Sequence, residues 1–326
     1  MQAIVSRTYG PPDVVHLEEV ATPVPREREV RVRNHAGVVS AAECTARKGD
    51  DFLARLYFGL IRPRFPILGT NFSGRVESVG SAVTKFHVGD HVFGAAGPSF
   101  GAHAELLCVP DDGIIATKPA GLADADAVAI SDGGLTALPF LRDAGHVESG
   151  QSILINGASG AVGTAAIQLA RHWGAVVTAV CSTSNLELVR SLGARHVIDY
   201  TEADFTQTER TYDIVFDAVG KSSFSRCRRL LKPGGIYLTT VPSLTILAQM
   251  MWTAKIGDKR AAIAFTGLRK PRDMVKDLIF LGDLAESGHY VPVIDARYPM
   301  EQASEAHAHV DTGRKKGSVV ITMARA

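Results

Sequence analysis

Residues 151–170, QSILINGASGAVGTAAIQLA, decide the fold class of this chain. The apolar run at 153–155 predicts a buried strand, and the isoleucine and leucine among alanines after the last glycine predict a helix. Between them, Ala158-x-Gly160-x-x-Gly163 predicts a tight turn whose small residues let a pyrophosphate approach the backbone. The helix N-terminus then offers free N–H groups and a partial positive charge to the phosphates. An ordinary turn is the alternative, and the flanking strand and helix favour a dinucleotide site.

The sequence after this turn continues to alternate between apolar strands and helices. Strands are predicted at 175–180, 196–198, 212–216, 236–240 and 261–267, and helices at 186–192 and 224–231. Continuous apolar strands that alternate with helices indicate a parallel sheet covered on both faces. We therefore predict a doubly wound, parallel-sheet Rossmann domain at residues 122–267. The apolar-rich segment 244–265 is interrupted by charges, and we interpret it as a helix-rich excursion between strands.

The segments on either side have a different pattern. Alternating residues at 29–33 and recurring glycine turns between short β-prone runs predict a compact antiparallel barrel within residues 1–121. Residues 268–326 contain two predicted helices, 273–287 and 300–310, and a closing strand at 318–322. We expect this C-terminal part to return to the first domain, with the ligand cleft between the two domains.

Composition excludes several classes of function. The 326 residues are 46% hydrophobic and 21% charged with a net charge of +1, which suits a protein of about two globular domains and gives no support for nucleic acid or a membrane surface as partner. The first residues lack the apolar core of a signal peptide, and the four cysteines are scattered without C-x-x-C spacing. We expect a cytoplasmic location, no disulfide framework and no structural zinc site.

Short motifs along the whole chain carry a family resemblance: PILGT at 66–70, GRV at 74–76, VGDHVFG at 88–94, GLTA at 134–137, the glycine turn, and LKPGG at 231–235. With them the chain resembles the medium-chain dehydrogenase/reductase superfamily, specifically its zinc-lacking quinone oxidoreductase-like branch. The resemblance implies a GroES-like β-barrel domain beside the Rossmann domain and a nicotinamide cofactor. The apolar edge strand at 261–267 has no charged residue to protect it, so we expect a homodimer formed through this strand, as relatives form. The alternative is a monomer in which the segment 244–255 folds over the edge.

The resemblance also bears on metal binding. Zinc enzymes of this superfamily carry a Gly-His-Glu motif where this chain reads Gly69-Thr70-Asn71, and the lobe with four cysteines is absent. Cys44 alone cannot assemble a three-ligand site. His103 alternates with Glu105 as on one side of a strand, where a histidine is more often satisfied structurally. We therefore predict no metal.

The cofactor is predicted to be NADP(H). An NAD-binding fold typically has an acid at the end of the second strand, whereas here hydroxyl and amide side chains occupy 182–185 and the first acid is Glu187. The same side chains can simply cap the next helix. No basic residue lies at 182–185, and Arg190 or Lys316 are the candidates for a charge near the phosphate. The predicted cofactor contacts are Thr136, Asn156, Ala158, Ser159, Gly160, Ala161, Val162, Gly163, Ser182, Thr183, Asn185, Tyr200, Val219, Val241, Phe265 and Lys316.

Hydride transfer without a metal requires an acceptor that is already polarised, as quinones and α,β-unsaturated carbonyls are. The family pattern suggests Ser40, Glu43, Tyr57 and Asn71 as candidates for the substrate cleft. Asn71 can equally stabilise its own loop. Tyr57, with Phe58, forms either an apolar lip or part of a helix core. No residue is identified as the proton donor.

Three hypotheses follow for a small-molecule site. The leading one is a metal-free, NADPH-dependent reductase of quinones or activated enones. An enoyl-thioester reductase on the same scaffold would need a basic groove. The clusters of basic residues at 62–64 and 269–272 could form parts of such a groove. A protein that binds NADPH as a sensor or structural component, without useful turnover, fits the same glycine turn.

Overall fold

The computed structural model describes residues 1–50, 52–97 and 99–323 and divides into two compact units. Unit 1 comprises Met1–Asp132, Arg269–Gly288 and Pro292–Ala326, and unit 2 comprises Gly133–Leu268 and His289–Val291. The predicted boundary at 121/122 lies just before helix α3 (Asp124–Pro139), whereas the observed division falls inside that helix. Within the described ranges, no helix is long and apolar enough to span a bilayer.

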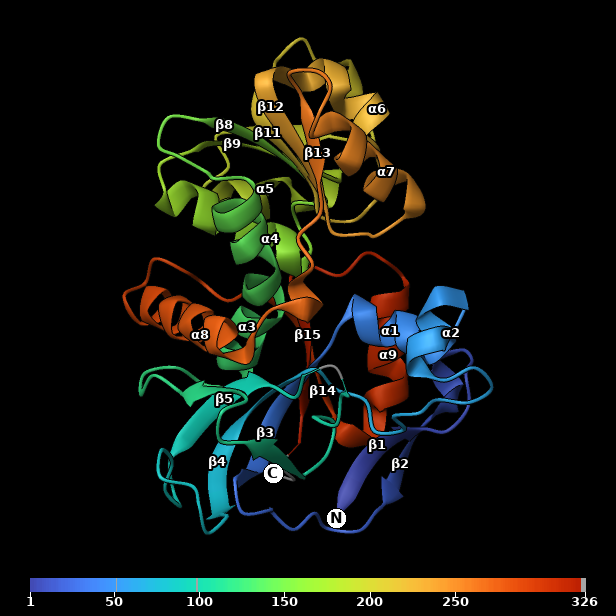
Figure 1. Ribbon diagram of the computed structural model, residues 1–326, viewed down its shortest axis with the longest axis vertical. Helices are drawn as coiled ribbons and strands as arrows, with labels where there is room; N and C mark the ends of the chain where they lie inside the picture. The colour runs from blue at the N-terminus through green and yellow to red at the C-terminus, as the bar shows by residue number, and fades with distance from the viewer. Residues whose placement is uncertain (51, 98, 324–326) are drawn as a thin grey trace. The chain divides into compact units, whose positions relative to one another are not determined.

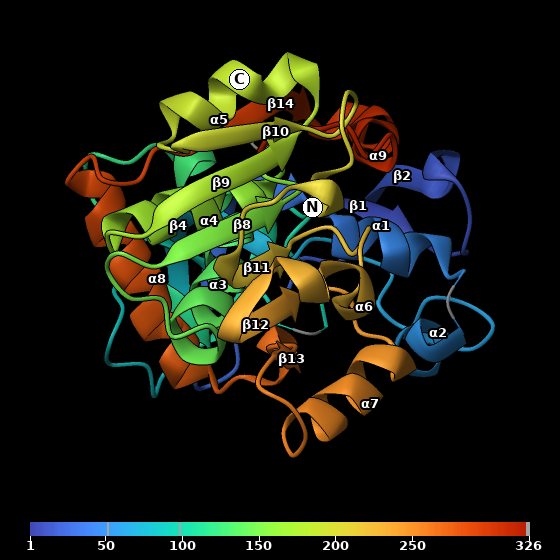
Figure 2. The ribbon, with the colours of Figure 1, turned by 90° about the horizontal axis from the view of Figure 1, so that it is seen from above.

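Unit 2 is built on a parallel sheet whose strand order is β10-β9-β8-β11-β12-β13 (Figure 2). Its strands are β8 (Ser152–Asn156), β9 (Val176–Cys181), β10 (His196–Asp199), β11 (Tyr212–Asp217), β12 (Leu231–Thr239) and β13 (Arg260–Ala262). Its helices, besides the end of α3, are α4 (Ala161–His172), α5 (Leu186–Ser191), α6 (Phe224–Cys227) and α7 (Leu244–Thr253). The central strands are parallel and fully buried, which confirms the predicted doubly wound α/β class.

The strand order determines where this sheet can bind a ligand. The chain runs outward from β8 to β9 and β10, and then crosses back to β11 on the other side of β8. Open parallel sheets bind their ligands outside the carboxyl ends of the strands at such a reversal. The glycine turn follows β8 and therefore lies at this point.

Two predicted elements of unit 2 differ in the structure. The helix predicted at 224–231 ends at Cys227, and after a 3₁₀ turn strand β12 begins at Leu231. Leu231 pairs with Tyr212, and a register shift follows before Ile236 pairs with Ile214, so the Pro-Gly-Gly segment is accommodated as an irregularity within a strand. The edge strand predicted at 261–267 is only the three residues of β13, because they alone pair with β12.

Unit 1 is built mainly on an antiparallel sheet of order β14-β15-β3-β4-β5-β7, with β6 paired to β3 (Figure 1). Its strands are β1 (Gln2–Ser6), β2 (Val15–Glu19), β3 (Glu29–Val39), β4 (Asn71–Val79), β5 (His91–Ala95), β6 (Leu106–Pro110), β7 (Ile114–Thr117), β14 (Ile294–Pro299) and β15 (Ser318–Thr322). Its helices, besides the start of α3, are α1 (Ala41–Lys48), α2 (Phe52–Phe58), α8 (Pro271–Glu286) and α9 (Ala303–Asp311).

The C-terminal segment is integrated into this sheet. Strand β15 pairs antiparallel with β3, and β14 pairs parallel with β15, so the sheet is not antiparallel throughout. Helix α9 packs on α1 and on β15 over an apolar cluster that includes Ile4, Val39 and Ile321. This packing holds α1 and α9 side by side (Figure 1).

Candidate active site

In the glycine turn after β8, close packing requires glycine at position 163, whereas the space around Gly160 is open. A Cβ added at Gly163 would lie 2.2 Å from the carbonyl oxygen of Gly157, so helix α4 can approach the turn only with glycine there. A Cβ added at Gly160 would meet nothing closer than 3.7 Å, and Gly160 has an ordinary φ of −77°. No contact within the protein therefore requires glycine at position 160. The missing side chain leaves room for a ligand at the N-terminus of α4.

The turn is anchored to its neighbours by hydrogen bonds. The N–H of Ala158 donates to the Val180 carbonyl at 3.0 Å, which ties the turn to β9. The Asn156 amide donates at 3.0 Å to the buried carboxylate of Asp217 at the end of β11. The same carboxylate accepts the N–H of Val219 at 3.3 Å, so the turns after β8 and β11 are held together. Asn156, a predicted cofactor residue, thus has a structural role at this edge.

Helix α4 presents its N-terminus at the same edge. Its N-cap is Gly160, which provides no side-chain cap, and the first helical residues are Ala161 and Val162. N–H groups in the first turn of a helix have no acceptor within the helix. They and the helix dipole favour an anionic group, as expected for the pyrophosphate of a dinucleotide.

A polar rim follows β9 and touches the glycine turn. The Asn185 amide donates to the hydroxyl of Ser159 in the turn at 3.0 Å and to the hydroxyl of Ser182 at 3.2 Å. The side-chain oxygen of Asn185, Oδ1, is buried and has no hydrogen-bond partner among the described residues. Ser182 is half-buried and Thr183 is exposed at this rim, and the Thr183 hydroxyl lies 3.0 Å from that of Thr201.

An acid near this rim was missed by sequence reasoning, which considered only β9 and the residues that follow it. Asp199 ends β10 and is paired in register with Cys181 at the end of β9. Its carboxylate accepts the N–H and hydroxyl of Thr201 at 2.9 and 2.6 Å. Hydrogen bonds from Thr183 and Thr201 lower the pKa of Asp199. The parallel register of neighbouring strands is the signal that would have located it.

Four further predicted cofactor residues are exposed apolar or aromatic side chains of unit 2: Tyr200, Val219, Val241 and Phe265. A Cβ on Gly157 would lie 2.4 Å from Val219, and one on Gly220 would lie 2.3 Å from Val241. Val219, after β11, therefore borders the glycine turn, and Val241, after β12, borders Gly220 beside it.

The remaining residues considered for cofactor binding are Thr136, Arg190 and Lys316. Thr136 lies near the end of α3, not at a helix start, and Gly133 of the same helix allows close packing because a Cβ there would lie 2.1 Å from the Ala161 carbonyl. Arg190 pairs with Glu187 at 2.6 Å. Lys316 belongs to unit 1, and its contact with the cofactor stays a prediction.

In unit 1, the substrate candidates belong to a buried polar network. Ser40 caps α1 by accepting the N–H of Glu43 at 3.3 Å. The Glu43 carboxylate accepts the N–H and hydroxyl of Thr70 at 2.9 and 2.8 Å. Glu43 is fully buried, and this burial raises its pKa to about 8. Its side chain therefore supports Thr70 from inside the domain rather than lining a surface.

Asn71 has protein partners on both sides of its amide. Its NH₂ group donates to the Ser131 hydroxyl at 3.1 Å, and its oxygen lies 2.7 Å from the Thr70 hydroxyl. Asn71 is 5% exposed. These contacts fit the loop-stabilising alternative for this residue.

Tyr57 lies in an aromatic group at the end of α2. Its ring meets Phe58 edge-to-face at 5.0 Å, and Phe58 stacks on Phe100 at 5.3 Å. Tyr57 remains 48% exposed, and the neighbouring Ile61 is 92% exposed. The group presents an apolar surface, in keeping with the lip predicted for it.

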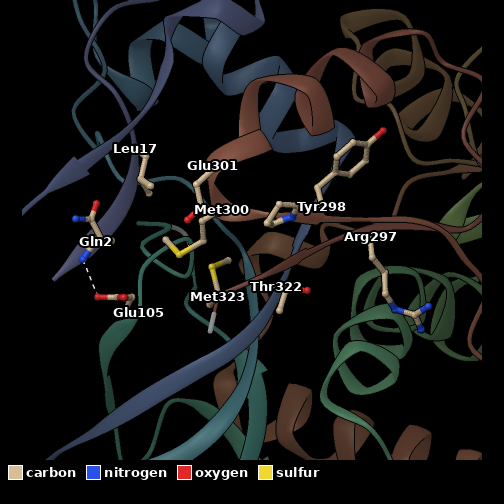
Figure 3. Close-up of a pocket in the computed structure, with 10 residues that line it drawn as sticks. Gln2, Leu17, Glu105, Arg297, Tyr298, Met300, Glu301, Thr322 and Met323 are labelled. Atoms are coloured by element: carbon tan, nitrogen blue, oxygen red, sulfur yellow. Dashed lines mark hydrogen bonds between the residues drawn. The ribbon is translucent and has the colours of Figure 1, made fainter. Parts of the chain in front are cut away.

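A separate cavity of about 570 Å³ lies in unit 1, between the β1–β2 hairpin and the β14–β15 pair (Figure 3). Met300 and Met323 contribute apolar surface, and Glu105 accepts the N–H of Gln2 at 2.8 Å at its side. None of the residues predicted for cofactor or substrate lines this cavity.

Comparison with known proteins identifies the family. Residues 26–124 match the model of the alcohol dehydrogenase GroES-like domain, and residues 192–321 match that of a zinc-binding dehydrogenase. The chain is 32% identical over 333 residues to 2-methylene-furan-3-one reductase of Solanum lycopersicum, covering 98% of this chain and 79% of the relative. The chain belongs to the medium-chain dehydrogenase/reductase superfamily, in its quinone oxidoreductase-like branch.

Two other members of the superfamily are similar over nearly the whole chain. The NADPH-dependent alkenal/one oxidoreductase of Arabidopsis thaliana is 30% identical, with 98% of this chain and 79% of the relative covered. The solved quinone oxidoreductase from Coxiella burnetii has a TM-score of 0.89 at 30% identity, covering 100% of this chain and 99% of that one. The chain is therefore a member of a family of NAD(P)H-dependent oxidoreductases.

The description of one family model raises the question of a catalytic zinc. Thr70 and Asn71 stand where the zinc enzymes have the histidine and glutamate of their motif; the Thr70 hydroxyl is hydrogen-bonded to Glu43 and Asn71, and the Asn71 amide donates to Ser131. Cys44 is buried with its Sγ 3.5 Å from His307 Nδ1, and one thiol does not make a three-ligand site at this motif. The residues at these positions do not fit a catalytic zinc.

Proposed function

We propose that this protein uses NADPH to reduce quinones or activated α,β-unsaturated carbonyls, without a metal ion at the substrate. The observation that carries the proposal is the open space at Gly160 beside the uncapped N-terminus of α4. A pyrophosphate approaching the backbone there would meet free N–H groups and no side chain.

The preference for NADPH rests on the rim after β9. The Ser182 hydroxyl lies at this rim, and the Asn185 amide donates to Ser159 and Ser182 within the same group. The Thr183 and Thr201 hydroxyls bond to Asp199, whose carboxylate stays ionised, so we propose that the phosphate binds on the Ser182 side of the rim. An adenosine 2′-phosphate would accept hydrogen bonds from the rim hydroxyls, whereas an acid on β9 itself would repel it.

The acceptor class follows from the groups available around the reaction. When bound, the nicotinamide supplies a hydride, and the acceptor must delocalise the resulting charge if no metal polarises it. Quinones and enones do so by adding hydride to a conjugated carbon while charge moves to oxygen. The printed names of the relatives describe reductases of a methylene-furanone, of alkenals and alkenones, and of quinones, which supports this choice.

The enoyl-thioester alternative has less support from the charged residues of the described chain. Of its proposed basic groove, Arg269 pairs with Asp277, and Arg64 lies over the ring of Phe65 at 5.5 Å. Both arginines therefore have partners within the protein. We also propose a homodimer formed through the edge strand β13, and a cytoplasmic location. The alternative is a monomer in which α7 covers this edge, and the Ala261 N–H donating to Thr253 of α7 at 3.1 Å favours that alternative.

A panel assay tests the proposal. Oxidation of NADPH by the purified protein is followed with quinones, enones and acyl thioesters, each before and after dialysis against a chelator. We expect turnover with quinones or enones that survives the chelator. Turnover with acyl thioesters alone would favour the alternative enzyme, binding of NADPH without turnover would favour the sensor, and loss of turnover that zinc restores would refute the metal-free reaction.

A further inference from the structure

Three chemistry-bearing residues that are distant in the sequence meet inside unit 1. Glu43 lies on α1, His103 precedes β6, and His307 lies on α9, the helix that packs against α1 (Figure 1). One ligand atom of each residue lies within 4.8 Å of those of the other two, and all three residues are 0% exposed. His307 had no role in the sequence-based prediction, and His103 was expected to be a satisfied strand residue.

The contacts of the two histidines leave one lone pair on each ring. His103 Nε2 donates to the Val38 carbonyl at 2.8 Å, which leaves Nδ1 as the unprotonated nitrogen. His307 Nδ1 lies 3.5 Å from Cys44 Sγ. The Cys44 thiol donates to the backbone carbonyl of His307 at 4.0 Å. With Nδ1 as donor to sulfur, Nε2 of His307 carries the lone pair. Histidine ligands of metal ions are held in this manner, with the other ring nitrogen donating to a protein group.

The two carboxylate oxygens of Glu43 also differ in their contacts. Its Oε1 accepts both hydrogen bonds from Thr70, while its Oε2 lies 3.6 Å from His103 Nε2 without forming a hydrogen bond. In the described part of the chain, Glu43 Oε2, His103 Nδ1 and His307 Nε2 all lack a hydrogen-bond partner. Buried polar atoms are nearly always paired, so three unpaired atoms on three adjacent residues call for an occupant.

We propose that Glu43, His103 and His307 bind a divalent transition-metal ion, with Zn²⁺ the foremost candidate, as a structural site inside unit 1. Two imidazoles and the Glu43 carboxylate, which releases its proton when the ion binds, form a donor set that zinc accepts. The ion would join α1, α9 and the segment before β6.

The charges around the three residues are compatible with a cation. Arg47, the buried cationic group on the same helix as Glu43, is paired with Asp311 at 2.5 Å and donates to the Gly10 carbonyl at 2.7 Å. Its charge is therefore compensated within the protein.

This site differs from the catalytic zinc of the dehydrogenases in position and in role. It does not use Thr70 or Asn71, which stand at the position of that motif. Because all three ligands are fully buried, the ion would be enclosed within unit 1, and a buried water molecule would fill its fourth coordination position. The ion would stabilise the domain, and the proposed hydride transfer does not depend on it.

The test uses the full chain and measures metal directly. Protein stripped with a chelator is dialysed against Zn²⁺ alone, washed, and analysed for zinc, and a parallel sample is loaded with Co²⁺ for visible spectroscopy. We expect one zinc per chain, a higher Tm with zinc, and the intense d–d absorption of low-coordinate cobalt. Glu43→Gln keeps an acceptor for Thr70 and should weaken zinc binding at least about 100-fold. The control His87→Ala changes a histidine whose side chain is 81% exposed and should bind as the wild type does.

Two results would overturn the proposal. Clearly substoichiometric zinc in the wild type after loading would mean that a buried water molecule or no occupant satisfies these atoms. Equal zinc affinity in the wild type and Glu43→Gln would place the ion elsewhere. If Glu43→Gln does not fold, the cobalt spectrum of the wild type still decides, because octahedral, surface-bound cobalt absorbs only weakly.

Discussion

Substituting alanine separately at two glycines of the same turn distinguishes a ligand site from a packing requirement. In Gly160→Ala the new Cβ meets nothing closer than 3.7 Å, and in Gly163→Ala it lies 2.2 Å from the Gly157 carbonyl oxygen and 2.7 Å from Ala158 backbone atoms. The two variants add the same methyl group three residues apart. If the space at Gly160 is for a pyrophosphate, they will have different consequences.

The expected magnitudes follow from these distances. Gly160 is the N-cap of α4, so alanine there costs about 1 kcal/mol or less of folding free energy. The methyl group would stand between backbone and pyrophosphate, and we expect the Kd for NADPH to rise at least about tenfold, or about 1.4 kcal/mol. Gly163→Ala forces the backbone apart and should cost about 1–3 kcal/mol of stability, in addition to weaker binding.

Both quantities are measurable on the same samples. Urea unfolding gives the free energy of unfolding, and titration of nicotinamide fluorescence gives the Kd for NADPH. The reasoning is refuted if Gly160→Ala binds NADPH as tightly as the wild type. It is also refuted if the loss of binding in Gly160→Ala is matched by a loss of stability as large as that of Gly163→Ala.

Three other predictions concern charge and assembly. Ser182→Asp should weaken NADPH binding far more than NADH binding, and equal effects in fluorescence titrations would count against the proposed phosphate site. Burial raises the pKa of Asp124, but hydrogen bonds from His35 and Ser73 outweigh it and lower the pKa to about 2. Ionised Asp124 therefore stabilises the fold above its unfolded pKa of 3.8, and this is lost as pH falls toward 2. Asp124→Asn should cost about 2 kcal/mol at pH 7 and about half of that at pH 3, and a pH-independent difference in urea unfolding would contradict this. Light scattering should give twice the chain mass of 34.8 kDa, falling to one chain in Ala262→Lys on the edge strand, whereas a wild-type monomer would exclude the dimer.

Local pattern predicted the parallel sheet well, because its strands are continuous apolar runs bounded by glycine or polar residues. It failed where tertiary pairing decided the structure. Leu231 looked like the end of a helix, but pairing with Tyr212 makes it the start of β12. Residues after Ala262 looked like a strand, but only three residues reach β12. Neither result is encoded in the period of the hydrophobic pattern.

The residues of the candidate site were likewise predictable only where the pattern is local in the sequence. The glycine turn was predictable because its spacing is local, whereas the neighbours of Glu43 come from distant parts of the chain. His307 shares a buried helix face with Ala303, Ala306 and Val310, and that spacing was the available signal that its ring points inward. What the sequence could not indicate is that this face packs on α1 beside Glu43.

The most direct test of the central claim follows the hydride itself. NADPH carrying deuterium at the transferred position of the nicotinamide is mixed with the protein and an enone under single-turnover conditions, and the product is analysed by mass spectrometry and NMR. We predict one deuterium per NADPH oxidised, located on the β-carbon of the saturated product. Oxidation of NADPH without deuterium in the product, or no oxidation with any enone or quinone, would contradict the account.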